Sequence, residues 1–177
     1  MNIENLIRES EASLRDAFSV AEEIAYFNQC KVMEAFRKNK VALRHFVPST
    51  GYGYGDEGRD ALNALFADIF GAEAALVSPN IVSGTHALTV GLFGVLKAGD
   101  TMFSISGDPY DTHKEVIEGN GNGSLADYGI KFKKCDLIDG GFDKEAIAVG
   151  LKDKTVKVVF IQRSRGYEWR DALSEDK

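Results

Sequence analysis

Ser83, Gly84 and Thr85 are the residues best suited to bind a ligand, because they stand directly before an apolar run with helical spacing. The start of a helix leaves backbone N–H groups unpaired, and the helix dipole favours negative charge there. Small residues expose those N–H groups, so the segment fits an anion such as phosphate. The same residues also fit an ordinary N-cap, in which the Ser83 hydroxyl closes its own helix.

Tyr54 and Arg59 lie in a glycine-rich segment, residues 45–59, whose composition does not suit a regular helix. One interpretation is a flexible linker. Tyrosines are unusual in a linker, however, which favours an ordered loop that carries Tyr54 and Arg59 to a functional site.

Three arginines, Arg163, Arg165 and Arg170, follow an apolar segment near the end of the sequence. The planar guanidinium group pairs well with carboxylate or phosphate, so these side chains are candidates for ligand recognition. A solvated basic turn is the other interpretation, and the segment alone does not separate the two.

Helices and strands are expected to alternate through most of the chain. The pattern predicts a helix over residues 4–38 and an apolar helical stripe that ends at Gly71. Strands are predicted near 74–78, 101–106, 130–135 and 156–162, with helices near 84–97, 112–118 and 143–151. This order is typical of an α/β fold, a mainly parallel sheet covered by helices, preceded here by an N-terminal helical arm. The helix at 84–97 carries two apolar rows, so we expect it to be buried on most sides.

Ligands in such folds bind at the carboxyl ends of the strands. The loops expected at this edge are residues 78–85, 106–110, 136–142 and 162–167. Polar or aromatic side chains occupy three of them, including Ser83, Tyr110 and Gln162. This convergence favours an anion site at Ser83–Thr85 over a simple cap.

Composition excludes several other classes of protein. The net charge is −6, from 21 basic and 27 acidic residues, which argues against a nucleic-acid-binding surface. No apolar run approaches the ~20 residues of a membrane span, and the N-terminus does not resemble a signal peptide. Cys30 and Cys135 are isolated, so neither a disulfide framework nor a zinc site is indicated. We expect a cytoplasmic protein.

Four segments in this order carry a resemblance to a known family: GYGYGDEGRD, IVSGTHAL, GDPYDTHKEVI and FIQRSRGY. Together they resemble the methionine gamma-lyase-like enzymes often called aluminium resistance proteins. That family has the fold-type-I pyridoxal-phosphate fold and is related to the cystathionine lyases. The resemblance runs from about Val41 to Leu173 and weakens in the N-terminal arm.

The resemblance implies roles for individual residues. The turn Ser83–Thr85 matches the one that holds the phosphate of pyridoxal 5'-phosphate through backbone amides, and Tyr110 matches the aromatic side chain that stacks on the pyridine ring. Tyr54 and Arg59 resemble the pair that reaches the phosphate from a neighbouring subunit, although their spacing is wider than in the better-known lyases.

The strand-end loop of the family approaches cofactor and substrate, and the residues that match it are Gln162, Arg163 and Ser164. Other positions depart from the family pattern. Ser78 and Asn80 stand where Arg and Gln are expected, Gly55 replaces a usual Asp, and His113 replaces a usual apolar residue.

Neither the family's Schiff-base lysine nor the Asp that pairs with the pyridine nitrogen matches any position of this sequence. No catalytic residue of that kind is therefore predicted here, and we expect the chain to be the N-terminal part of a longer enzyme. Residues 1–50 would form a helical arm and lead-in, and residues 51–177 part of the cofactor-binding large domain.

The resemblance implies a carbon–sulfur lyase that cleaves a sulfur-containing amino acid by β- or γ-elimination and assembles as a homodimer or homotetramer. Whether this chain catalyses the reaction by itself is left open. An alternative is a catalytically inactive module that only binds or dimerises. A nucleotide-binding α/β domain is less favoured, because no GxGxxG motif follows a predicted strand.

Overall fold

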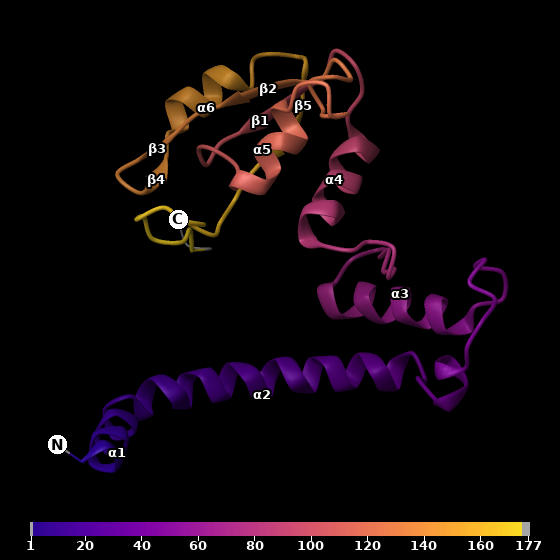
Figure 1. Cartoon of the computed structure of the whole chain (residues 1–177), viewed down its shortest axis with the longest axis vertical. Helices are drawn as coiled ribbons and strands as arrows, with labels where there is room; N and C mark the ends of the chain where they lie inside the picture. Colours follow the sequence, from indigo (N-terminus) through magenta and orange to yellow (C-terminus); the bar gives the residue numbers. More distant parts are fainter. Residues whose placement is uncertain (1, 175–177) are drawn as a thin grey trace. The chain divides into compact units, whose positions relative to one another are not determined.

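The computed structural model describes residues 2–174, and the chain divides into two units, Met1–Asn80 and Ile81–Lys177 (Figure 1). Each unit has its own internal contacts and is described by itself. The division into an arm over residues 1–50 and a larger domain over 51–177 stays a prediction.

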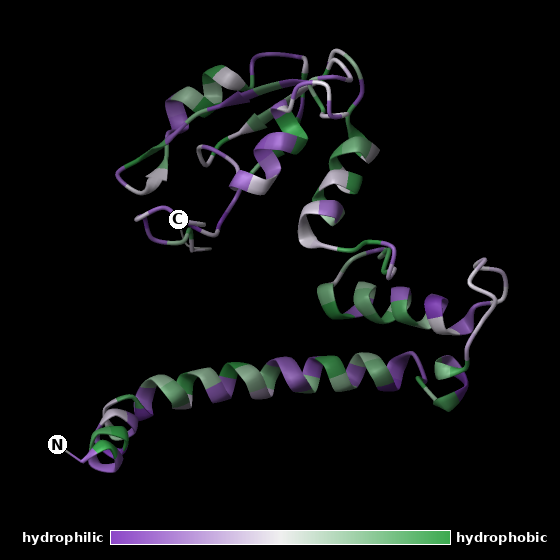
Figure 2. Cartoon of the chain, in the orientation of Figure 1, coloured by the Kyte–Doolittle hydropathy of each residue, from purple (hydrophilic) through white to green (hydrophobic). Residues whose placement is uncertain are grey.

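The first unit begins with two helices, α1 (Ile3–Ser13) and α2 (Arg15–Lys38), where the sequence predicts one. The chain leaves helical geometry at Leu14, with φ −102° and ψ 4°. The predicted end near residue 38 is confirmed. Figure 2 shows hydrophobic and hydrophilic residues mixed along α2, and large apolar side chains such as Phe27 are exposed on it within this unit.

The end of α2 packs on α3 (Glu57–Phe70), with the short 3-10 helix η1 (Leu43–Phe46) beside α3. Asp68 connects the two long helices, because its carboxylate pairs with Lys38 and accepts a hydrogen bond from Asn39 Nδ2 at 2.7 Å. Asp56 caps α3 by accepting from Arg59 N–H at 3.1 Å. Gly71 ends α3 with φ +63°, as predicted.

The second unit contains a three-stranded parallel sheet of β1 (Thr101–Ser104), β2 (Lys131–Lys134) and β5 (Val156–Phe160), in the order β2-β1-β5. These strands confirm the predicted α/β class and the parallel sheet. A short antiparallel hairpin follows β2 and consists of β3 (Leu137–Ile138) and β4 (Gly141–Phe142).

Helices pack on both faces of the sheet, and the strand residues alternate between these faces. On one face Met102 packs in a core with α4 (Gly84–Val95) and α5 (Asp111–Glu118), and its buried members are Leu92, Leu96, Met102, Ile117, Leu125 and Ile130. On the other face α6 (Lys144–Gly150) lies over β1, so close that a Cβ at Gly150 would clash with the Phe103 ring. Figure 1 shows α5 and α6 on opposite sides of the strands.

Two sequence predictions are wrong. Residues 74–77 do not form a strand; instead, Val77 N–H donates to Asn63 Oδ1 at 2.8 Å, because no partner strand is available to it within the described residues. The helix α4 is not buried on most sides: Leu92 is buried, but Val90 is exposed and Val95 is 64% exposed. Only one face of α4 packs on the core of this unit.

Within residues 2–174, no helix combines the length and the apolar character needed to cross a lipid bilayer.

Candidate functional site

The start of α4 has the geometry of a capped helix. Ser83 Oγ accepts a hydrogen bond from His86 N–H at 3.1 Å, and His86 Nδ1 accepts from Val82 N–H at 3.3 Å. The cap interpretation of Ser83 is therefore confirmed. The cap does not exclude an anion, because the first-turn N–H groups of Gly84 and Thr85 have no acceptor inside the helix and take part in no hydrogen bond described for residues 2–174.

The space beside this turn is open. A Cβ built on Gly84 would meet no heavy atom within 4 Å. The side chain of Thr85 points to a second helix, since its Oγ1 lies 3.1 Å from Thr112 Oγ1 on α5. Tyr110 is the residue that directly precedes α5. The predicted anion turn and Tyr110 thus belong to two helix starts that are linked to each other by a hydroxyl pair.

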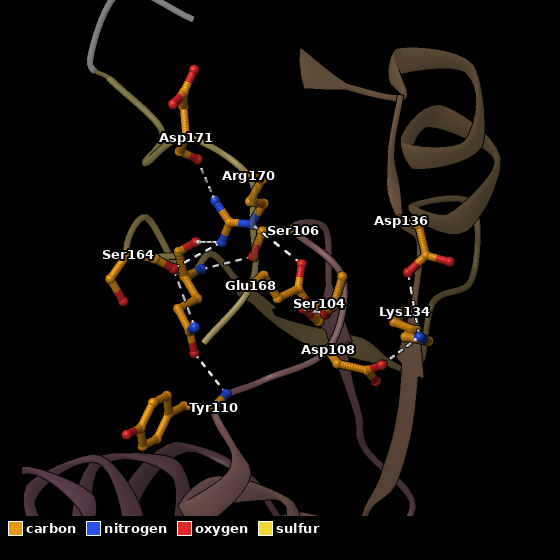
Figure 3. Close-up of polar contacts among 12 residues, drawn as sticks. Ser104, Ser106, Asp108, Tyr110, Lys134, Asp136, Ser164, Glu168, Arg170 and Asp171 are labelled. Atoms are coloured by element: carbon orange, nitrogen blue, oxygen red, sulfur yellow. Dashed lines mark hydrogen bonds and ion pairs between the residues drawn. The ribbon is translucent and has the colours of Figure 1, made fainter. Parts of the chain in front are cut away.

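The loop after β5 meets the loop after β1 through Gln162. Its backbone N–H donates to Ser106 Oγ at 2.8 Å, and its side-chain Oε1 accepts from Tyr110 N–H at 2.7 Å. Figure 3 shows Tyr110, Ser106 and Ser164 around this junction. The sequence predicted that these loops converge, and Gln162 is the side chain that joins them.

Arg170 holds this loop through backbone carbonyl groups. It donates from Nη2 to Ser164 O at 2.8 Å and to Gln162 O at 3.3 Å, and from Nη1 to Asp171 O at 2.9 Å (Figure 3). Arg163 Nε similarly donates to Leu173 O at 3.0 Å. Both guanidinium groups therefore hold the backbone of the loop. The sequence had suggested either ligand recognition or a solvated turn for these arginines, and neither interpretation includes this role.

Tyr110 lies among aromatic rings. Tyr167 stacks on it with ring centroids 5.5 Å apart and 28° between the planes, and the His113 ring lies 6.4 Å away at 67° to the Tyr110 plane. The pKa of Tyr110 is raised above its ordinary value. The main cause is the hydroxyl of Tyr167, and the second is partial burial. Burial lowers the pKa of His113. Sequence reasoning did not select Tyr167, and its only signal was its place beside the arginines.

A charged cluster lies at the carboxyl ends of β1 and β2. Lys134 Nζ is 2.8 Å from Asp108 Oδ2 and 3.3 Å from Asp136 Oδ1 (Figure 3). The hydrogen bond to Asp108 raises the pKa of Lys134, and the same contact lowers the pKa of Asp108. Lys134 is therefore held in its protonated form. Nothing in the sequence pattern pointed to this pairing across 26 residues.

Tyr54 and Arg59 belong to the first unit, and their predicted role stays a prediction. Tyr54 is 88% exposed. Arg59 Nε lies 3.9 Å from Asp56 Oδ2, and hydrogen bonds from the Arg59 N–H and the Ser49 hydroxyl lower the pKa of Asp56. Arg59 and Asp56 also line a cavity of about 570 Å³ together with His45.

Within the second unit, the predicted residues Ser83–Thr85, Tyr110 and Gln162 come from converging elements. They offer unpaired amides for an anion, an aromatic ring for a planar group, and a carboxamide that accepts a hydrogen bond from the backbone of Tyr110. Among residues 2–174, no group of three or more His, Cys, Asp or Glu side chains could hold a metal ion.

Comparison with known proteins extends this picture. Residues 3–177 match the family model described as methionine gamma-lyase. An uncharacterized protein of Bacillus subtilis (strain 168), YnbB, is 48% identical over 169 residues, which cover 93% of this chain and 40% of that protein.

Solved structures are similar over nearly the whole chain. A carbon–sulfur lyase involved in aluminum resistance from Clostridium novyi NT is 42% identical with a TM-score of 0.89, and covers 97% of this chain and 42% of its own. A candidate cystathionine beta-lyase involved in aluminum resistance from Listeria innocua is 43% identical with a TM-score of 0.93, over 99% of this chain and 44% of its own. The chain therefore spans less than half the length of these relatives, and it belongs to the methionine gamma-lyase family.

Proposed function

We propose that this chain forms part of a pyridoxal-phosphate-dependent carbon–sulfur lyase that acts on a sulfur-containing amino acid. One observation carries the proposal: the start of α4, Tyr110 and Gln162 meet in one unit, at the carboxyl edge of a parallel sheet. The family of the chain, and the carbon–sulfur lyase among its structural relatives, support the same reaction class.

The turn before α4 suits the phosphate group of the cofactor. The N–H groups of Gly84 and Thr85 lie at the positive end of the helix, and the space beside Gly84 is free of protein atoms within 4 Å of an added Cβ. Hydrogen bonds to a charged group contribute roughly 1.5–3 kcal/mol each, and the helix dipole adds about 0.3–1 kcal/mol. The Ser83 hydroxyl is occupied by the cap, so the backbone amides are the main donors.

Tyr110 suits the pyridine ring. Its backbone is fixed by Gln162, and its ring lies beside the start of α5, which the Thr85–Thr112 hydroxyl pair links to the phosphate turn. Aromatic rings attract one another in offset stacks, which orients a planar ligand as well as binding it. The residues present therefore fit both ends of the cofactor.

When bound, pyridoxal phosphate supplies an electron sink for reactions at the α-carbon of an amino acid. The described residues of this chain bind the phosphate, orient the ring and hold the loop around it. The sulfur-containing substrate class follows from the family relationship, and which amino acid of this class is cleaved is a separate question from cofactor binding.

A parallel titration with pyridoxal phosphate and inorganic phosphate tests the proposal. Tyr110→Ala is expected to weaken pyridoxal phosphate binding by roughly two- to tenfold, the magnitude of one aromatic contact, and to leave inorganic phosphate almost unchanged. Tyr26→Ala, which truncates an exposed tyrosine on α2 outside the predicted site, serves as the control. Equal weakening of both ligands by Tyr110→Ala, or no saturable binding of pyridoxal phosphate to the unaltered chain, contradicts the proposal.

A second candidate is a module that binds the cofactor without catalysing a reaction. The observation that favours it is the state of Lys134, whose protonated amine is held by Asp108 and Asp136 and is therefore not a nucleophile. An assay for thiol release from cystathionine, cysteine and methionine separates the candidates. Thiol release by the purified chain rejects the binding module, and cofactor binding without release from any of the three rejects catalysis by this chain alone.

A further inference from the structure

The segment after β5 contacts Tyr110 through three of its residues. Gln162 fixes the backbone of Tyr110 through the 2.7 Å hydrogen bond. The backbone of Gly166 lies against the ring, where an added Cβ would stand 3.0 Å from Tyr110 Cδ2. Tyr167 stacks on the ring at a centroid distance of 5.5 Å. One short segment thus contacts both the backbone and the ring of the same tyrosine.

The turn that carries Tyr167 is itself held in place. Glu168 N–H donates to Arg165 O at 3.1 Å, which closes a four-residue turn, and Gly166 supplies the left-handed conformation with φ +59°. Arg170 ties the start of the segment through its bond to Ser164 O. The position of Tyr167 over Tyr110 is therefore set by the loop backbone.

We propose that Tyr167 is a positioning residue, which supports one face of the Tyr110 ring and leaves the opposite face for the planar ring of the ligand. This inference rests on the proposed function, because it assigns the face of Tyr110 that does not contact Tyr167 to the pyridine ring. A phenol ring has two faces. When one face is already in contact with Tyr167, the side chain loses less conformational freedom as a ligand ring stacks on the other. Tyr167 is 81% exposed, so its truncation removes little buried surface and the unit is expected to keep its fold.

The contact can be measured on the chain without any ligand. With ¹³C-labelled tyrosine, the Tyr110 signal is assigned from Tyr110→Phe and followed as a function of pH. Tyr167→Phe is expected to lower the pKa of Tyr110 toward its ordinary value, because the hydroxyl of Tyr167 is the main cause of the increase. The other groups that face Tyr110 are Asp111 and His113, and both remain in this variant. Tyr128→Phe, whose ring packs on Phe93, is the control and should leave the signal unchanged.

A glycine pair tests the backbone part of the contact. Gly166→Ala places a methyl group against the Tyr110 ring and strains a positive φ, whereas Gly140→Ala strains a similar φ of +73° with no heavy atom within 4 Å of the new Cβ. The Tyr110 signal is expected to shift only in Gly166→Ala. Equal shifts in both variants, or in neither, would show that the turn does not position the ring.

Ligand binding decides whether the contact serves the site. Tyr167→Ala is expected to weaken pyridoxal phosphate binding by roughly two- to tenfold and to leave inorganic phosphate unchanged, and Tyr167→Phe should recover most of the loss. Tighter pyridoxal phosphate binding in Tyr167→Ala overturns the inference, because Tyr167 would then compete for the ligand's face; unchanged binding overturns it as well. If the unaltered chain binds no pyridoxal phosphate, the proposed function fails. If the Tyr110 signal does not respond to Tyr167→Phe and Tyr167→Ala, the positioning role of Tyr167 fails, whatever the chain binds.

Discussion

At the scale of single residues, Ser83 and Gly84 have different roles at the start of α4. The Ser83 hydroxyl satisfies His86 N–H, whereas Gly84 keeps the approach to the next amides open. A cap and an anion site are often treated as competing explanations, but they use different N–H groups of the same turn.

This division predicts unequal effects of two substitutions. Gly84→Val should weaken phosphate and pyridoxal phosphate binding by about tenfold or more, because its side chain fills the open approach and displaces at least one charge-assisted bond of roughly 1.5 kcal/mol. Ser83→Ala should mainly lower the free energy of unfolding by about 1 kcal/mol, the usual value of a cap. Calorimetric titration and urea unfolding measure the two effects.

Gly94→Val is the matched control for Gly84→Val, since it makes the same change in the same helix and also has no heavy atom within 4 Å of the new Cβ. It should leave both ligands unaffected. If Gly84→Val weakens neither ligand, the start of α4 is not the phosphate site.

Sequence reasoning selected Ser83 from its place before an expected helix, and the family resemblance selected Tyr110 and Gln162; their role at a cofactor site stays a prediction. It did not identify the roles of Arg170 and Lys134. Arg170 binds backbone carbonyls of its own loop, and Lys134 pairs with an aspartate 26 residues away. Such partners depend on how the loops fold, and no local pattern records them.

At the scale of elements, the strands and helices of the second unit follow from alternating apolar segments, and most of their bounds lie within one or two residues of those predicted. The two wrong predictions, a strand at residues 74–77 of the first unit and the burial of α4 in the second, have a common cause. Residues 74–77 have the composition of a strand, but a strand requires a partner for its backbone, and Val77 bonds to Asn63 instead. The apolar rows of α4 predicted burial, but burial requires a neighbour on each face, and this unit supplies only one.

The start of β5 provides a prediction about pH. Asp153 accepts bonds from Thr155 N–H at 2.9 Å and Thr155 Oγ1 at 2.7 Å and pairs with Lys133 at 3.2 Å, and together these lower its pKa from 3.8 to about 2. Because the folded pKa is depressed, the contribution of Asp153 is complete above the unfolded value and is lost as pH falls through about 2. Urea midpoints measured from pH 5 to pH 2 should therefore fall more steeply for the unaltered chain than for Asp153→Asn. Parallel curves for the two proteins would contradict this assignment.

The glycine-rich loop between α5 and β2 provides a prediction about stability. Asp127 accepts hydrogen bonds from the N–H groups of Gly121 at 3.0 Å, Gly123 at 2.9 Å and Ser124 at 3.1 Å. Asp127→Ala removes all three hydrogen bonds and should lower the free energy of unfolding, measured as a lower urea midpoint. Asp127→Asn keeps an acceptor oxygen and should cost less; an equal cost for both variants would show that the charge, not the acceptor, matters.

At the scale of the molecule, the chain supplies two units that carry different parts of the predicted site. The second holds the amide turn, Tyr110 and Gln162, whereas the first holds Tyr54 and Arg59, which the family resemblance assigns to a neighbouring subunit. The side chains of Tyr52 and Tyr54 are both more than 80% exposed. Tyrosine side chains are usually at least partly buried, so this exposure is unusual.

This arrangement predicts that the protein assembles as a homodimer or a larger homo-oligomer. Light scattering over a dilution series at micromolar concentration should give at least twice the mass of one chain, with the monomer appearing only at the lowest concentrations. A monomer mass at every concentration would contradict assembly by this chain.

The proposed function depends above all on the start of α4, which we propose holds the phosphate of pyridoxal phosphate. The most direct measurement is the ¹H–¹⁵N spectrum of the chain labelled at glycine and threonine during titration with pyridoxal phosphate and, separately, inorganic phosphate. We expect the amide signals of Gly84 and Thr85 to shift saturably with both ligands, while those of Gly94 and Thr155, away from the turn, stay in place. Saturable binding of pyridoxal phosphate with unshifted Gly84 and Thr85 amides would contradict it.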